Sequence, residues 1–187
     1  FGEGTSVPPR KFKKNDQIIE VETIRDLSKI ISVSKNKMWE NSDSSWVANK
    51  GKKIHEILSY VYTWEDLDPA IKKALHNGVI SNNEINEIKN LLKMVIEDKE
   101  MSIYFTKGLK IKNEVDILLK NNTVLRPDRL VFKENSVTII DYKTGLENKK
   151  HIDQILEYKK EIEKMGYIVV ASILAYMNSN YLKLKRV

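Results

Sequence analysis

The chain has 187 residues, 41% of them hydrophobic and 31% charged, a composition typical of one globular domain with a sizeable core. No apolar run approaches the roughly 20 residues that a membrane-spanning helix needs, so we expect no membrane partner. Cysteine is absent, which excludes disulfides, iron–sulfur clusters and thiolate zinc sites and fits a reducing, cytoplasmic compartment. The net charge of +6 modestly favours a polyanionic partner, with nucleic acid first. No segment matches the phosphate-binding loop of ATPases, so we expect no ATP hydrolysis by that route.

The N-terminal residues 1–22 are typical of a linker or arm, because they contain two adjacent prolines, two glycines and a basic run. The chain begins at Phe1 and shows no signal peptide, so we expect a fragment of a longer protein. A capping pattern at Thr23 predicts the start of a helix with Leu27 on its apolar face. The domain is therefore expected to span residues 23–187.

After a polar break at residues 41–45, apolar residues recur at helical spacing in four segments. We expect helices over 48–63, from the Trp64–Pro69 loop to Leu75, from a capping box at Ser81–Glu84 to Ile96, and over 149–165. Apolar segments bounded by turn residues predict strands over 103–106, 109–119, 123–132, 137–143, 167–177 and 181–185. Turn residues at Asn121-Asn122 and Lys133–Ser136 predict hairpins.

The C-terminal part of the chain predicts a parallel crossover. Strand 137–143, helix 149–165 and strand 167–177 form a β-α-β unit of the right length. We therefore expect an α/β fold whose mixed sheet is antiparallel at the hairpins, parallel at the crossover and flanked by helices.

Charged residues end the strand predicted over 137–143. By the two-residue period of a strand, Asp141 and Lys143 share a face with the apolar residues before them. Charges on an apolar face cost several kcal/mol each unless they are paired or bound to a metal. Asp128, on the neighbouring strand, could reach the same point, and two carboxylates with one ammonium indicate a hard-cation site beside a phosphate-binding charge. The alternative interpretation is a surface ion pair without a catalytic role.

Two further groups of polar residues lie on the predicted helices. His55 lies at the edge of an apolar face, one turn beyond Gly51, whose small size would let another group approach closely. A lone histidine on a helix is more often structural than a ligand. Gln154 and Tyr158 are neighbours on the surface of the last helix, where they could hold a phosphate backbone or order a nearby loop.

Two carboxylates lie in the strand predicted over 109–119. Glu114 and Asp116 share a face by the two-residue period, and Glu114 could add a carboxylate to the site. The other interpretation is that one or both are half-exposed charges or partners of Arg126 or Arg129.

Four motif blocks follow one another in the chain: Gly51-x-x-x-His55, Arg126-Pro127-Asp128-Arg129, Asp141-Tyr142-Lys143-Thr144-Gly145 and Gln154-x-x-x-Tyr158. Together they resemble the PD-(D/E)XK nuclease superfamily, and more narrowly the C-terminal nuclease domain of the RecB and AddA helicase–nucleases. The resemblance covers residues 48–187. It implies a restriction-endonuclease-like fold, exonuclease or endonuclease cleavage of DNA that depends on Mg²⁺, and work in double-strand-break repair and recombination.

The resemblance also implies a ligand set for the metal. The ligands would be the side chains of His55, Asp128 and Asp141 and the backbone carbonyl of Tyr142. The cofactor would be Mg²⁺, which keeps several waters and so suits a site with few protein ligands. A histidine ligand would ease its replacement by Mn²⁺.

Catalytic roles are implied for four more residues. Lys143 would be the catalytic lysine, which orients the attacking water or stabilises charge that grows on the phosphate. Gln154 and Tyr158 would be accessory residues beside the metal and the DNA backbone. Glu114 falls where such domains often carry a glutamate on the strand before the first aspartate.

The expected partners are DNA and a motor. Helicase domains would lie upstream of Phe1 in the same polypeptide, single strands would be the preferred substrate because a motor delivers unwound strands, and a second helicase–nuclease subunit is a further candidate partner. The iron–sulfur cluster of some relatives is missing, because the chain has no cysteine. The alternative is a non-cleaving DNA-binding or scaffold module with the same fold. Such modules usually lose a metal carboxylate or the lysine, so the presence of Asp128, Asp141 and Lys143 favours the nuclease.

Overall fold

The computed structural model describes residues 42–187, with side chains from Asn49 onward. The chain divides into two units after Met38, and every described residue belongs to the second unit, Trp39–Val187. The expected arm over 1–22, its boundary with the domain and the helix starting at Thr23 lie outside the described residues.

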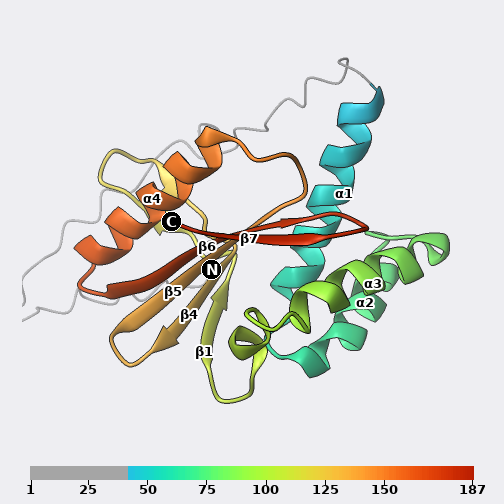
Figure 1. The fold of residues 1–187 in the computed structure, drawn as a ribbon, viewed down its shortest axis with the longest axis horizontal. Coiled ribbons are helices and arrows are strands. Elements are labelled where there is room, and N and C mark those ends of the chain that lie inside the picture. Colours follow the sequence, from blue (N-terminus) through green and yellow to red (C-terminus); the bar gives the residue numbers. More distant parts are fainter. Residues whose placement is uncertain (1–41) are drawn as a thin grey trace, which may run out of the picture. The chain divides into compact units, whose positions relative to one another are not determined.

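A five-stranded mixed sheet organises the described part of the chain (Figure 1). In spatial order its strands are β1 (Lys110–Asn113), β4 (Arg129–Lys133), β5 (Ser136–Lys143), β6 (Ile168–Met177) and β7 (Leu182–Arg186). β5 and β6 are parallel and the other neighbours are antiparallel. A separate two-stranded ribbon pairs β2 (Ile117–Leu118) with β3 (Val124–Leu125). The predicted α/β fold, with a sheet that is antiparallel at the hairpins and parallel at the crossover, is confirmed.

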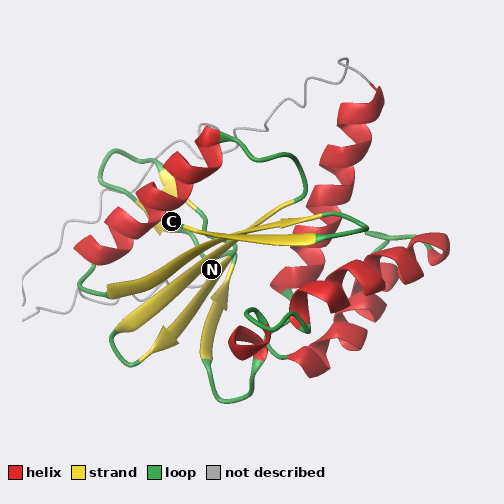
Figure 2. Ribbon diagram, in the orientation of Figure 1, coloured by secondary structure: helices red, strands yellow, loops and turns green. Residues whose placement is uncertain are grey.

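Helices cover both faces of this sheet (Figure 2). They are α1 (Ser42–Ser59), α2 (Leu67–His76), α3 (Ile85–Ile96) and the crossover helix α4 (Lys149–Lys164), with short 3₁₀ turns η2 (Trp64–Asp66), η3 (Asn82–Glu84) and η4 (Ser102–Phe105). None of these described helices is long and apolar enough to cross a lipid bilayer.

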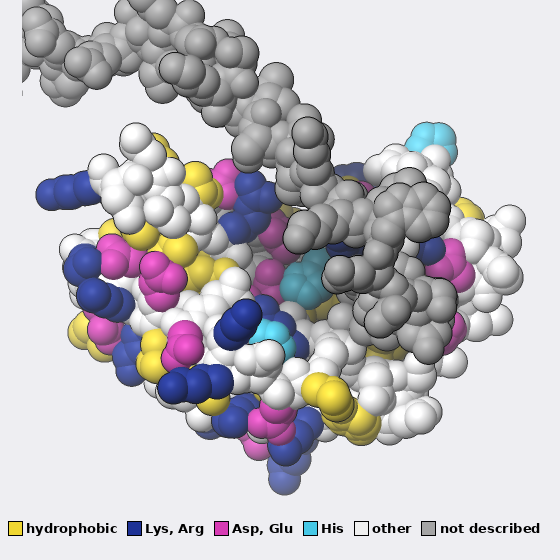
Figure 3. Space-filling view, turned by 90° about the horizontal axis from the view of Figure 1, so that it is seen from above, with side chains coloured by type: hydrophobic (Ala, Val, Ile, Leu, Met, Phe, Trp, Pro, Cys, Tyr) yellow, Lys and Arg dark blue, Asp and Glu magenta, His cyan; other side chains and the backbone are white. Residues whose placement is uncertain are grey.

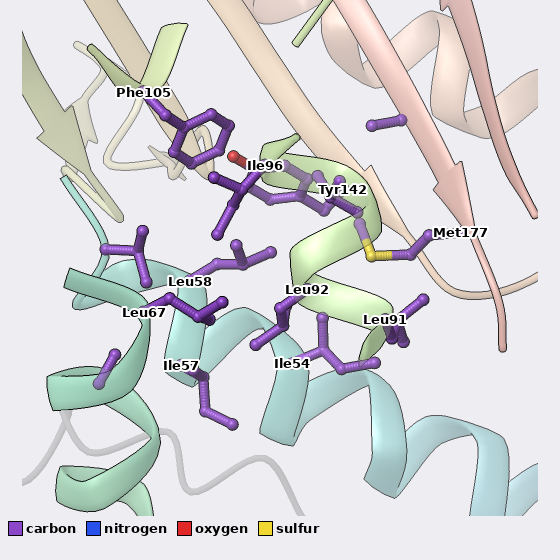
Figure 4. Close-up of a cluster of buried hydrophobic side chains, with 14 of the residues drawn as sticks. Ile54, Ile57, Leu58, Leu67, Leu91, Leu92, Ile96, Phe105, Tyr142 and Met177 are labelled. Carbon is purple, nitrogen blue, oxygen red and sulfur yellow. The ribbon is translucent and has the colours of Figure 1, made fainter. Parts of the chain in front are cut away.

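β5 divides its side chains between two hydrophobic clusters, because alternate residues of a strand point to opposite faces. Ile140 and Tyr142 join the first cluster, which α1, α2 and α3 cover (Figure 4). Val137 and Ile139 join the second cluster, which α4 covers with residues such as Ile155 and Tyr158. By the same alternation, Asp141 and Lys143 share the face of Val137 and Ile139, as the sequence predicts, and this is the face that α4 covers.

Turn residues mark the helix and strand ends, and the capping and turn signals predicted at Ser81–Glu84 and Asn121-Asn122 are confirmed. Asn77 caps α2 and Gly78 follows with φ of 71°, a left-handed conformation that glycine adopts without steric cost. Ser81 and Glu84 form the expected capping box. Asn122 has φ of 62° in the tight turn between β2 and β3.

Four strand or helix predictions are wrong or need new bounds. Residues 103–106 are not a strand, because the 3₁₀ turn η4 lies there and the buried Met101 and Phe105, four residues apart, both join the first cluster. The strands expected over 109–119 and 123–132 are each broken in the middle, where the chain leaves the main sheet to form the ribbon β2–β3. α1 begins at Ser42 rather than residue 48, since serine and aspartate are favoured in a first helical turn.

Candidate metal centre

Strand register brings three carboxylates together at one end of the sheet. Arg129 pairs with Ile140 in β5 and with Asn113 in β1. One residue further along each antiparallel pair, Asp128 therefore lies beside Asp141 on one side and Glu114 on the other. The backbone N–H of Glu114 donates to the carbonyl of Asp128 at 3.0 Å, which continues the ladder to this point.

His55 on α1 closes the group. Its Nδ1 lies 3.1 Å from Asp128 Oδ1 and 3.9 Å from Glu114 Oε1. One ligand atom from each of these three residues lies within 4.8 Å of the others, which is close enough for all three to coordinate a single ion. Figure 3 shows histidine, acidic and basic side chains on the face seen there.

Asp128 is held from two sides. It is 9% exposed, and its Oδ2 accepts a hydrogen bond from the backbone N–H of Tyr142 at 2.6 Å, while Oδ1 faces His55. A carboxylate that accepts a short backbone hydrogen bond has a fixed orientation. Asp128 therefore presents one oxygen to the space between His55 and Glu114.

Glu114 adopts an uncommon backbone conformation. Its φ of 50° places it in the left-handed region, which disfavours a residue with a Cβ and costs on the order of 1–3 kcal/mol. The residue lies where the chain leaves β1 for the ribbon, and its side chain is half-buried beside His55. Strain of this kind concentrates at functional sites, where the surrounding structure holds it in place.

Asp141 is the most deeply buried carboxylate of the group, with 1% of its surface exposed. Burial, and then the charge of Asp128, raise its pKa to about 6, against the opposing effects of Lys143 and His55. Its Oδ2 forms an ion pair with Lys143 Nζ at 2.5 Å. The Lys143 ammonium is the only polar group found at this oxygen among the described residues. The group of possible ligand atoms within 4.8 Å of one another contains His55, Glu114 and Asp128, so Asp141, which the sequence predicts as a ligand, lies beside that group and is paired with Lys143.

Lys143 begins a chain of hydrogen bonds that runs onto α4. Its Nζ donates to Gln154 Oε1 at 2.9 Å, and Gln154 Nε2 donates to the Tyr158 hydroxyl at 2.8 Å. That hydroxyl donates in turn to the backbone carbonyl of Arg126 at 3.2 Å. The two helix residues, which the sequence could place only as neighbours, thus fix the position of the lysine and join it to the segment that carries Asp128.

Gly51 allows α1 to pack closely against the end of β5. A Cβ built on Gly51 would lie 2.7 Å from Thr144 Oγ1, which is closer than two such atoms approach without one of them moving. The close approach expected from the small residue is therefore made by the threonine that follows Lys143. It places His55, one helical turn further along α1, beside the carboxylates.

The two carboxylates of strand 109–119 have different partners. Glu114 lies in the group of possible metal ligands with His55 and Asp128, whereas Asp116 forms a two-pronged ion pair with Arg126, at 2.6 and 3.1 Å. Glu114 therefore fits the interpretation as a further carboxylate of the site, and Asp116 fits the interpretation as a partner of Arg126.

Sequence reasoning missed the role of Arg129 and Asn113. Arg129 is 0% exposed, and its guanidinium donates to the carbonyls of Val61, Tyr62 and Tyr104 at 2.7, 2.7 and 2.8 Å. Asn113 accepts from Arg129 at 3.2 Å and donates to carbonyls at the end of α1, with Ser59 at 3.0 Å.

Together these two side chains satisfy the carbonyl groups at and just beyond the C-terminal end of α1, where a helix carries partial negative charge. The residues that anchor α1 are therefore the immediate sequence neighbours of Glu114 and Asp128. One feature of the sequence could have indicated that Arg129 is buried. It is an arginine at the start of an otherwise apolar strand, on the same face as Val131.

The carboxylates of Asp128 and Glu114 favour positive charge at this point, and their effect on His55 shows it. Burial would lower the pKa of His55, but the hydrogen bond to Asp128 and the nearby Glu114 outweigh it and raise the pKa to about 10. Carboxylate oxygens with one imidazole are donors that Mg²⁺ and Mn²⁺ accept. An open cavity of about 590 Å³, lined in part by His55, Glu114, Arg126 and Asp128, gives access from solvent.

The described residues thus define an α/β domain with an acidic centre, a buried aspartate paired with a half-buried lysine, and an adjoining open cavity. No family model matches the chain, and no curated protein matches it.

Proposed function

We propose that the chain is a metal-dependent deoxyribonuclease domain of the PD-(D/E)XK superfamily, with a restriction-endonuclease-like fold. The observation that carries the proposal is the convergence of Asp128, Asp141 and Lys143 at one end of the β4–β5 hairpin, with His55 and Glu114 within ligand distance of Asp128. Burying two carboxylates beside a lysine lowers the stability of the folded domain. A role in metal-assisted cleavage of a phosphodiester would explain why these charged residues are present.

The residues present suit the hydrolysis of a phosphodiester. The substrate is an anion that repels an attacking hydroxide, so the site must supply positive charge. When bound, a divalent ion offers that charge and lowers the pKa of a coordinated water. His55, Glu114 and Asp128 would hold the ion, and Asp141 offers the adjacent carboxylate whose Oδ2 has only Lys143 opposite it.

Lys143 is placed to act on the phosphate. Its ammonium lies beside Asp141 Oδ2 and can orient the attacking water or stabilise negative charge as it grows on the phosphate oxygens. Gln154 and Tyr158 act as positioning residues, because their hydrogen bonds hold the ammonium in place. Position matters here, since a misplacement of about 1 Å can cost about 100-fold in rate.

The same proposal extends to the larger protein that would contain this domain. The domain would be the C-terminal part of a RecB- or AddA-like helicase–nuclease, with motor domains in the same polypeptide, and would act in double-strand-break repair and recombination. A strand delivered by a motor is held near the site, which raises its effective concentration. The chain alone is then expected to bind and cut DNA weakly, with single strands preferred.

End-labelled single-stranded and double-stranded DNA, incubated with Mg²⁺, with Mn²⁺ and with EDTA, tests the proposal. We expect cleavage with either metal and none with EDTA, and we expect Asp128→Asn and Asp141→Asn to abolish it. Asp68→Asn is the matched control, because Asp68 lies on α2 and its only described ion pair is with the surface Lys89. A chain that binds DNA but leaves it intact under all conditions is a non-cleaving module instead.

A further inference from the structure

A larger cavity, of about 870 Å³, lies beside the metal centre. β1 and β4 form its floor, and the β2–β3 ribbon and the C-terminal end of α4 form its walls. Its lining includes the apolar residues Leu130, Phe132 and Ile162 of the second hydrophobic cluster. The half-buried ring of Tyr167 also lines it and meets Phe132 edge-on, with the ring centroids 5.3 Å apart.

Strand register makes the floor of this cavity continuous with the metal centre. Lys110 pairs with Phe132 and Lys112 pairs with Leu130, and the next pair on the same face is Glu114 with Asp128. Because same-face residues of a strand follow every second position, Lys110 lies about 13 Å from the metal centre. That distance corresponds to about four stacked nucleotides, at about 3.4 Å each.

Basic charge at the rim of the cavity is not neutralised. The two acidic residues of the lining are already paired, Asp116 with Arg126 and Glu161 with Lys164. The other three lysines of the lining, Lys110, Lys112 and Lys120, are exposed, and within residues 49–187 none of them has a carboxylate at ion-pair distance. The Lys110 ammonium lies 5.6 Å from the centroid of the Phe132 ring, so charge and apolar surface are in contact. Figure 3 shows hydrophobic side chains exposed among basic and acidic ones on one face of the molecule.

We propose that this cavity binds an unpaired nucleic-acid strand and leads it to the metal centre. The lysines contact its phosphates, while the apolar floor and Tyr167 contact its bases. Proteins that bind single strands combine these two features, a basic rim and aromatic stacking surfaces. A duplex cannot use the cavity in this way, because its bases are paired inside the helix. The inference rests on the proposed nuclease function, since the metal centre gives the strand its destination.

Fluorescence anisotropy of a labelled oligothymidylate, measured on the whole chain in EDTA, tests the inference without cleavage. The test variant replaces Lys110, Lys112 and Lys120 with Gln. The matched control replaces Lys72, Lys93 and Lys99 with Gln, which removes the same charge from exposed positions on and just after the α2–α3 layer. We expect the test variant to bind about ten-fold or more weakly, and the slope of log K against log salt to fall by about 2, at about 0.7 for each lost contact. The control should bind like the parent chain.

A second measurement locates the strand. An oligothymidylate carrying 5-iododeoxyuridine, crosslinked by light and mapped by peptide mass spectrometry, should attach to the peptide of Tyr167 or Phe132. Equal weakening in both triple variants, or attachment only outside the cavity, would overturn the inference. Tighter binding of polyglutamate than of DNA at the cavity lysines would also overturn it, in favour of an acidic protein segment.

The inference and the proposed function fail separately. A chain that binds strands through the cavity but cuts nothing with Mg²⁺ or Mn²⁺ refutes the nuclease and leaves the strand-binding cavity in place. A chain that cuts DNA, while the test variant binds and cuts like the parent, refutes the cavity alone.

Discussion

Replacing Arg129 by Met should destabilise the domain strongly, although the residue touches neither metal nor substrate. Methionine fills a similar volume but donates no hydrogen bond. The change removes bonds to the carbonyls of Val61, Tyr62 and Tyr104 and to the side chain of Asn113. Arg129 is 0% exposed, and this burial lowers its pKa.

The magnitude follows from the groups left behind. Each buried acceptor without a partner costs about 1–3 kcal/mol, and part of this is offset because a buried guanidinium no longer has to be desolvated. We expect a net loss of about 3–5 kcal/mol in the free energy of unfolding, a large fraction of the stability of a small domain. The loss should also loosen the end of α1, and with it His55.

Urea unfolding followed by circular dichroism measures this effect, with Arg126→Met as the matched control. Arg126 is an arginine whose partner is the carboxylate of Asp116, and both side chains of that pair are more than half exposed, at 56% and 54%, so its loss should cost less than about 1 kcal/mol. If the two variants unfold at the same urea concentration, Arg129 is not the anchor described here.

Three further outcomes are expected. Lys143→Ala should fold and bind metal but cut DNA about 10²–10³-fold more slowly, and parental activity in a single-turnover assay would remove Lys143 from the mechanism. Asp128→Ala should weaken Mn²⁺ binding in isothermal titration at least as much as Asp141→Ala, because Asp128 lies within ligand distance of both His55 and Glu114; unchanged affinity in both would refute the site. Because the pKa of His55 is raised to about 10, the histidine is protonated at neutral pH and must lose its proton to bind metal. Titrations in buffers of different ionisation enthalpy should therefore show release of about one proton per ion, with affinity that rises with pH, and a proton count near zero would exclude His55 as a ligand.

The sequence could predict the part of the site that depends on strand period and hairpin pairing. Asp141 and Lys143 share a face because strands alternate, and the turn at residues 133–136 places Asp128 opposite Asp141. The helices and the crossover were also predictable, because the spacing of apolar residues is a local signal that the sequence shows directly.

The rest of the site depends on contacts between distant segments. The left-handed backbone at Glu114 and the burial of Arg129 arise where the chain leaves the sheet and where α1 ends against it. No local pattern encodes these features. The wrong strand over 103–106 has a similar cause, because η4 is fixed by packing around Met101 and Phe105 rather than by local preference.

The contact between Asp128 and position 142 has a consequence for how this site tolerates change. The donor is the main-chain N–H of Tyr142, and the Tyr142 side chain lies on the opposite face, in the core with α1, α2 and α3. Any amino acid except proline carries that N–H, so a substitution that still fits the core keeps the aspartate aligned. The Tyr142 ring also meets the His55 ring edge-on, with the ring centroids 6.3 Å apart. Substitution of the side chain therefore tests the packing of the core and of His55, whereas proline would in addition remove the N–H that aligns Asp128.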